Sequence, residues 1–267
     1  MNRMRTYARF LVLGFMELVA YRVAVVMLAF SIPIVLFSRY YLFAALYRRP
    51  DEVVGGYSLR GILTYVAMAW LLRSFFRTNI DRRIGRDVLS GDIVFDLMRP
   101  LNFHLMMAFR GLGKSLNRLL VISLPLIVIL LVSDILALPE SPAAWGAFLF
   151  AVLLAYAISF EIQYAIGLMA FFTGYNLNLI WTFDMIMQLA SGLILPLHFF
   201  PESVARLMMA LPFRHVYYTP VQLFAGQIAP ADAPALFVNA FAGLIVLVLF
   251  NETIFALGRR RVMIAGG

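Results

Sequence analysis

RTNIDRRIGRDVLSGDIVFDLMRPLNFHL, residues 77–105, is the stretch of sequence that decides the fold, because it is densely charged within an otherwise apolar chain. Hydrocarbon cannot hold it, since ionisable side chains inside a bilayer are costly. Its apolar residues recur at helical spacing, break at Ser90-Gly91 and stop at Pro100. The stretch therefore predicts two short amphipathic helices, joined at a glycine, that protrude from a membrane protein.

Two interpretations of this stretch are open from composition alone. A charged, protruding pair of helices is typical of a docking surface for a soluble partner. A solvated loop that only connects two spans gives the same charge pattern.

Composition places the chain among proteins that cross the bilayer several times. Of its 267 residues, 63% are hydrophobic and 13% are charged, with a mean hydropathy of +0.88; a soluble domain carries about 25% charged residues. The 22 lysines and arginines exceed the 14 acidic residues, but they flank apolar segments. That placement indicates membrane orientation and argues against a nucleic-acid partner. The absence of cysteine excludes disulfides and thiol catalysis.

Apolar segments of about 20 residues predict six transmembrane helices in an all-α membrane fold. Their expected ranges are 23–46, 57–76, 116–138, 145–172, 179–197 and 236–257. Residues 1–20 set arginines against helically spaced apolar residues, which predicts a helix in the inner headgroup region; the alternative is the start of a long first helix. The whole chain, 1–267, is expected to form one transmembrane domain.

The segment before the last span, 198–232, is apolar and aromatic but too rich in proline to cross the membrane. It predicts two short external helices, about 202–211 and 220–225, that dip into the outer leaflet as a broken re-entrant segment. Such backbone is tolerated only where protein or water covers it.

The distribution of basic residues predicts the orientation. The N-terminal region, the segment 77–118 and the run Arg259-Arg260-Arg261 carry most of them. The positive-inside rule places all three in the cytoplasm. Both termini and the charged stretch are then cytoplasmic.

No motif for catalysis or nucleotide binding meets its full pattern. Gly113-Lys114-Ser115 looks like the end of a phosphate-binding loop, but Ala108 stands where that loop needs a glycine. The three histidines are scattered and lack metal-ligand spacing. We therefore expect no catalytic residue, no metal site and no enzyme activity in this chain.

Polar groups within the predicted spans are the remaining candidates for function. Asp184, Gln188 and Ser191 fall three to four residues apart and form a polar stripe on one face of the fifth span. The stripe either lines a water-filled route for a polar or cationic substrate or bonds to neighbouring helices. Glu161 on the fourth span has the same two interpretations, and we favour a structural one in which it pairs with an arginine such as Arg22.

The layout and two motifs resemble the type-2 ABC exporter permeases. Residues 90–100, SGDIVFDLMRP, look like a loop motif of that family, which runs from a glycine and an acidic or amide residue to a basic residue and proline. Residues 199–226 are similar to a run that precedes the last span in small bacterial members: Phe199-Phe-Pro-Glu202, Leu211-Pro-Phe213, Tyr218-x-Pro220 and Gly226. Together these features cover nearly the whole chain.

The resemblance implies a permease subunit of an ATP-driven exporter in the bacterial plasma (inner) membrane. Two such permeases, identical or paired with a sibling, would form the pore among membrane lipids. Two separate ATPase subunits would bind ATP and Mg²⁺, so this chain itself would bind no cofactor. The polar stripe would face the seam between the two permeases, and Glu161 is a further pathway candidate. The residues implied to transmit nucleotide-driven closure are Arg82, Arg86, Asp87, Gly91, Asp92, Asp96, Arg99 and Pro100.

The alternative belongs to a different class of protein. An ion-coupled secondary transporter or channel would use Asp184 and Glu161 as its ion site and would work without an ATPase. Family substrates range over drugs, lipids and polysaccharides, so the resemblance implies no particular substrate.

Overall fold

The computed structural model describes residues 3–20, 22–47, 49, 52–133, 136–174 and 176–265. In this part of the chain a two-stranded antiparallel hairpin, β1 (Val53–Val54) and β2 (Tyr57–Ser58), accompanies the helices. The α-helices are α1 (Arg3–Ala20), α2 (Arg22–Leu46), α3 (Leu59–Phe76), α4 (Ile80–Ser90), α5 (Ile93–Leu97), α6 (Phe103–Arg118), α7 (Leu124–Val132), α8 (Pro142–Leu168), α9 (Ala170–Thr173), α10 (Leu177–Ala190), α11 (Glu202–Ala210), α12 (Tyr218–Phe224) and α13 (Ala233–Ala265).

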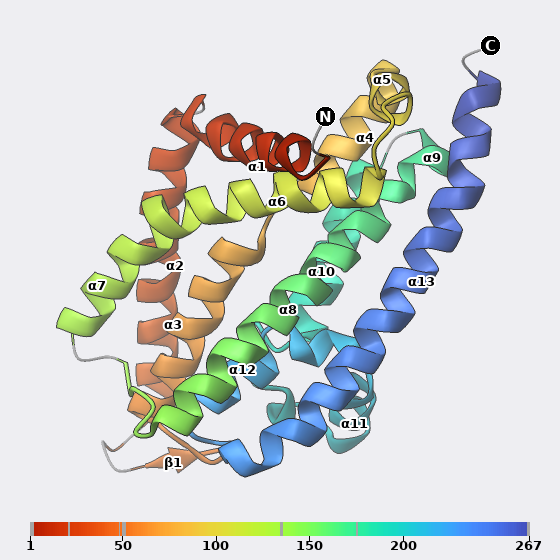
Figure 1. Cartoon of the computed structure of the whole chain (residues 1–267). Helices are drawn as coiled ribbons and strands as arrows, with labels where there is room; N and C mark the ends of the chain where they lie inside the picture. Colours follow the sequence, from red (N-terminus) through yellow and green to blue (C-terminus); the bar gives the residue numbers. More distant parts are fainter. Residues whose placement is uncertain are drawn as a thin grey trace.

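Four helical stretches among the described residues are long and apolar enough to cross a membrane: Leu59–Ser90, Phe103–Val132, Pro142–Thr173 and Pro230–Arg261. A shorter apolar helix covers Pro33–Leu46. In Figure 1, α2, α3, α8 and α13 run along the length of the molecule. Helices α1, α4, α5 and α6 gather at one end, called the charged end below, while α11, α12 and the hairpin lie at the opposite end. The predicted multi-pass helical membrane fold is confirmed.

The predicted third span, 116–138, begins close to the bend between α6 and α7, but it ends too late and it leaves out the helix that precedes it. The helix begins at Phe103, where the Asn102 side chain accepts a hydrogen bond from the Leu105 amide at 2.9 Å, and α7 already ends at Val132. Figure 1 shows α6 lying across the charged end beside α1 before it bends into α7. A π-helical turn, Leu119–Ser123, makes the bend. Charged residues interrupt the apolar run of α6, so hydropathy did not reveal it as a helix.

The predicted fifth span, 179–197, is too long. Helix α10 covers Leu177–Ala190 because the chain turns at Gly192, which takes a left-handed φ of 78°. A Cβ at Gly192 would lie 2.8 Å from the Tyr65 hydroxyl, so the turn requires glycine. The Tyr218 amide then donates to the Ser191 carbonyl at 2.9 Å, which brings the start of α12 against the end of α10.

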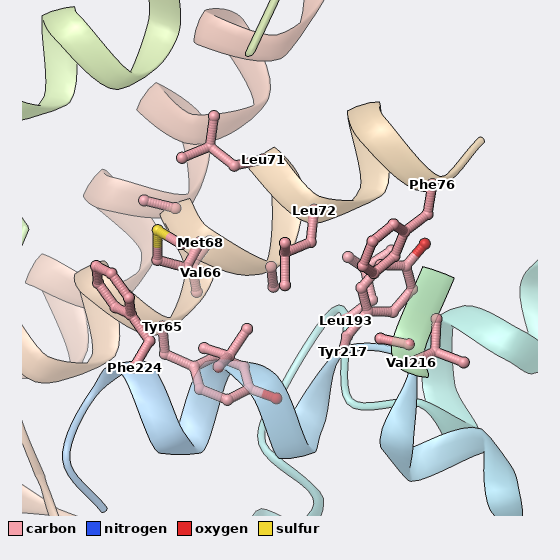
Figure 2. Close-up of a cluster of buried hydrophobic side chains, with 14 of the residues drawn as sticks. Tyr65, Val66, Met68, Leu71, Leu72, Phe76, Leu193, Val216, Tyr217 and Phe224 are labelled. Atoms are coloured by element: carbon pink, nitrogen blue, oxygen red, sulfur yellow. The ribbon is translucent and has the colours of Figure 1, made fainter. Parts of the chain in front are cut away.

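Aromatic side chains of α3 form the core that holds α12. Figure 2 shows Tyr65 and Phe76 of α3 with Tyr217 and Phe224 of the segment around α12. The rings of Phe76 and Tyr217 stack with centroids 5.9 Å apart. The two short helices predicted before the last span form as α11 and α12. Most residues of α12 are buried, so protein covers the polar backbone of α12.

Small residues let α1 and α6 touch backbone to backbone. A Cβ at Gly113 would run into the carbonyl of Leu11, and one at Gly14 would run into the carbonyl of Arg110. Gly113 therefore serves helix packing, and its neighbour Lys114 pairs with Glu17 of α1 at 2.7 Å.

We expect Gly113→Ala to lower the free energy of unfolding by about 1–3 kcal/mol, because the added methyl group forces two backbones apart. Gly146→Ala in α8 is the matched control, since nothing lies within 4 Å of its Cβ. Alanine favours a helix over glycine by about 1 kcal/mol, so the control should be neutral or stabilising. Thermal unfolding in detergent measures both, and a raised midpoint for Gly113→Ala would contradict the close packing.

Candidate functional site

An exposed apolar tip stands at the charged end, formed by α4 and α5. Gly91 joins the two helices as predicted: its φ is 82°, and its amide donates to the Val88 carbonyl at 3.2 Å. Three apolar side chains on the tip point away from the protein, since Leu89 is 63% exposed, Phe95 67% and Met98 76%. Such a cluster of exposed apolar side chains is typical of a protein interaction surface.

The base of the tip is packed firmly into the protein. Ile80, Ile84 and Ile93 are fully buried, and α4 packs against α8 and α9. A rigid body therefore carries the exposed surface.

One amide side chain in α8 connects α3 to α4. The Gln163 carbonyl oxygen accepts hydrogen bonds from the Thr78 amide at 3.0 Å and the Asn79 amide at 3.2 Å. Its Nε2 donates to the carbonyl of Phe76 at 2.9 Å. Gln163 thus satisfies the backbone groups left free between two helices, and it fixes the direction in which α4 leaves α3. An amide within an apolar helix was visible in the sequence, but its partners were not.

Glu17 of α1 is the centre of an ion-pair network beneath the tip. Its carboxylate pairs with Arg83 at 3.1 Å, with Lys114 at 2.7 Å and with Arg110. Arg83 also pairs with Asp87 at 3.2 Å. Burial raises the pKa of Glu17, but Lys114 and Arg110 outweigh it and bring the pKa down to about 2. The network therefore stays charged and joins α1, α4 and α6.

The residues expected to couple to a partner divide into three groups. Those exposed on the tip are Arg86, Gly91, Asp92, Arg99 and Pro100. Asp87 and Asp96 belong to the network, where Asp96 pairs with Arg99 at 3.2 Å and lies 3.9 Å from Arg83. Arg82 lies apart, with its guanidinium 5.3 Å from the centre of the Trp181 ring of α10.

The predicted polar stripe of α10 faces α3. Asp184 pairs with Arg73 at 2.9 Å and Arg77 at 3.2 Å, and the Gln188 amide donates to Asp184 at 3.1 Å. Ser191 is fully buried and its hydroxyl donates to the Met187 carbonyl. Two cations therefore compensate the carboxylate. Arg73 lies in the last turn of α3 and Arg77 directly follows that helix, which sequence spacing did not connect to α10.

Glu161 joins three helices. Its carboxylate lies 2.7 Å from His104 Nε2 of α6 and accepts a hydrogen bond at 2.7 Å from the Asn251 amide of α13. The side chain is 4% exposed, so these two partners, rather than water, stabilise its carboxylate. The side chain of Arg22, the arginine suggested from sequence, lies outside the described residues. Neither Glu161 nor Asp184 has an open, unpartnered carboxylate of the kind an ion site needs.

No group of three or more histidine or acidic side chains able to hold a metal occurs in the part of the chain that the structure describes. A family model described as "ABC-2 family transporter protein" matches residues 14–266. No curated protein matches the chain.

Proposed function

Because the chain belongs to the ABC-2 family of transporter proteins, we propose that it is the permease subunit of an ATP-driven exporter. ATP hydrolysis would take place on a separate ATPase subunit. Two permeases and two ATPases would form the complex in a bacterial inner membrane.

The exposed apolar tip is the observation that carries this proposal. Phe95 and Met98 are among the most exposed large apolar side chains of the described chain, and charged residues such as Arg86 and Asp92 surround them. An aromatic anchor with a polar rim is the usual composition of a protein–protein contact. The partner that fits is a soluble ATPase at the cytoplasmic surface.

The contacts around the tip supply a mechanical route into the membrane. A push on α5 would pass to α4 through the packing of Ile93 and to α3 and α8 through Gln163. The Glu17 network would carry the same push to α1 and α6. Small displacements are transmitted well because these contacts are rigid rather than compliant.

We further propose that six helical segments cross or enter the membrane, in addition to the re-entrant segment of α11 and α12, with both termini in the cytoplasm. Helix α2, with 25 residues, is long enough to span. Helix α10 has 14 residues, or about 21 Å, and covers only part of the hydrocarbon. The re-entrant segment of α11 and α12 completes the outer leaflet beneath it. Helix α1 lies in the inner headgroup region.

The second permease is proposed to pack against α10. Its outward face carries Trp181, 59% exposed, and Met185, 68% exposed, while Asp184 and Gln188 turn toward α3. The apolar face therefore suits a contact with another protein copy. In this arrangement the polar stripe does not face the seam as the resemblance implied: Asp184 and Gln188 hold α10 against α3, and Ser191 is fully buried. Glu161 holds α6, α8 and α13 together.

Co-purification tests the central claim. A tagged permease extracted in mild detergent should carry with it a soluble ATPase in equal copy number. Transport into vesicles by the purified chain without any ATPase would instead establish an ion-coupled secondary transporter or channel and would refute the proposal.

A further inference from the structure

A cavity of about 310 Å³ lies between α2, α3, α4 and α6 on the side of the charged end. It is bordered by four arginines, by three neutral polar side chains and by the apolar side chains of Trp70 and Ile122. The principal lining residues are Arg73, Arg77, Arg82, Arg118, Trp70 and Ile122.

The cavity carries an excess of positive charge. Arg73 and Arg77 share the carboxylate of Asp184, and Arg77 also pairs with Asp81 at 3.3 Å. Among the described residues, no carboxylate pairs with Arg82 or Arg118. Two carboxylates therefore serve four guanidinium groups, and the cavity attracts an anion.

Arg118 is the decisive side chain. It is 8% exposed, lines the cavity, and makes no hydrogen bond or ion pair within the described residues. Its Nε is buried without a partner, as is the Nε of Arg82. Buried charges are normally paired, so a guanidinium left in this state points to a ligand that supplies the missing acceptors.

We propose that this cavity binds the phosphate group of an anionic membrane lipid, with Arg118 and Arg82 as its main ligands. Guanidinium groups suit phosphate because their planar donors match two phosphate oxygens at once. The lipid would come from the leaflet at the charged end. The proposal requires that the chain lies in a membrane but does not require an ATPase partner, so the two proposals are tested separately.

A lipid, rather than free phosphate, fits the surroundings of the cavity. Arg118 is the last residue of α6, and the apolar residues of the π-helical turn and α7 follow at once. Ser31 of α2 also lines the cavity, and Ile34, one turn along the same helix, is 67% exposed. Charged donors thus stand directly beside apolar surface, which is the arrangement that a headgroup and its acyl chains require.

Lipid retention by the purified full chain tests the proposal. Delipidated protein is titrated with phosphatidylglycerol, phosphatidylcholine or inorganic phosphate, and bound molecules are counted by native mass spectrometry. We expect phosphatidylglycerol to bind more tightly than phosphatidylcholine, and inorganic phosphate not to displace it at equal concentration. Displacement by inorganic phosphate would overturn the lipid as the source of the phosphate.

Variants locate the site. Arg118→Gln and Arg82→Gln should each weaken phosphatidylglycerol binding about tenfold or more, because each removes a charged donor. Arg118→Lys should retain part of the affinity. Arg206→Gln is the control, since Arg206 lies on α11 at the opposite end with its side chain 75% exposed. If Arg118→Gln fails to fold, Arg82→Gln alone tests the site, because Arg82 is partly exposed. Wild-type affinity for phosphatidylglycerol in the folded glutamine variants would refute the site.

Discussion

Phe95→Asp is expected to abolish transport-coupled ATP hydrolysis while the permease still folds and inserts. Phe95 is 67% exposed, so the substitution removes little packing from the protein itself, and surface changes of this kind usually alter stability by less than about 0.5 kcal/mol. At a docked interface the same change replaces an aromatic anchor with a charge that must be desolvated. Anchors of this type contribute roughly 2–4 kcal/mol, which corresponds to a loss of affinity between about thirtyfold and a thousandfold.

The measurement is the ATPase-to-permease ratio after co-purification, together with ATP hydrolysis in reconstituted vesicles. Val53→Asp is the matched control, because Val53 is 63% exposed on the hairpin at the opposite end of the molecule. The control should keep the wild-type ratio. Normal hydrolysis with Phe95→Asp would show that the partner docks elsewhere.

Glu161→Leu should destabilise the protein more than any other substitution considered, by about 3–5 kcal/mol. Leucine fills a similar volume but offers no acceptor, so His104 and the Asn251 amide lose the carboxylate that now joins them. Three helices, α6, α8 and α13, lose a shared contact. Glu161→Gln keeps one acceptor oxygen and should cost less.

Thermal unfolding in detergent and the yield of inserted protein report this effect. Glu252→Leu serves as the control, because Glu252 lies next to Asn251 on α13 but is exposed. Should Glu161→Leu unfold at the wild-type temperature and yet change export, Glu161 would belong to the pathway rather than to the helix junction.

Local chemistry made the tip predictable from sequence. Helical spacing, a glycine at position 91 and a proline at position 100 specify two short helices without reference to the rest of the chain, and the structure has α4 and α5 there. The proline pattern before the last span likewise predicted α11 and α12, and protein covers α12 as such backbone requires.

Contacts between distant segments were not predictable in the same way. Glu17 is the lone acidic residue of α1, and its partner Arg110 is 93 positions further on. Asp184 and Arg73 are separated by 111 positions. Neither pairing leaves a periodic signal, because the spacing of residues along one helix says nothing about which other helix lies beside it. The start of α6 was missed for a related reason. Glu17 of α1 neutralises Arg110 and Lys114 of α6, and a hydropathy average along the chain does not detect a charge partner on another helix.

The close crossing of α1 and α6 bears on the order in which the chain assembles. Helix α1 packs against Gly113, and its Glu17 pairs with Lys114. About a hundred further residues must therefore be synthesised before α1 can make these contacts. Until then, the arginines and the apolar face of α1 can contact only the lipid surface. During synthesis, α1 is therefore expected to bind the membrane surface first. It would pack against α6 only after α6 has been made and the apolar helices that follow, α7 and α8, have begun to form.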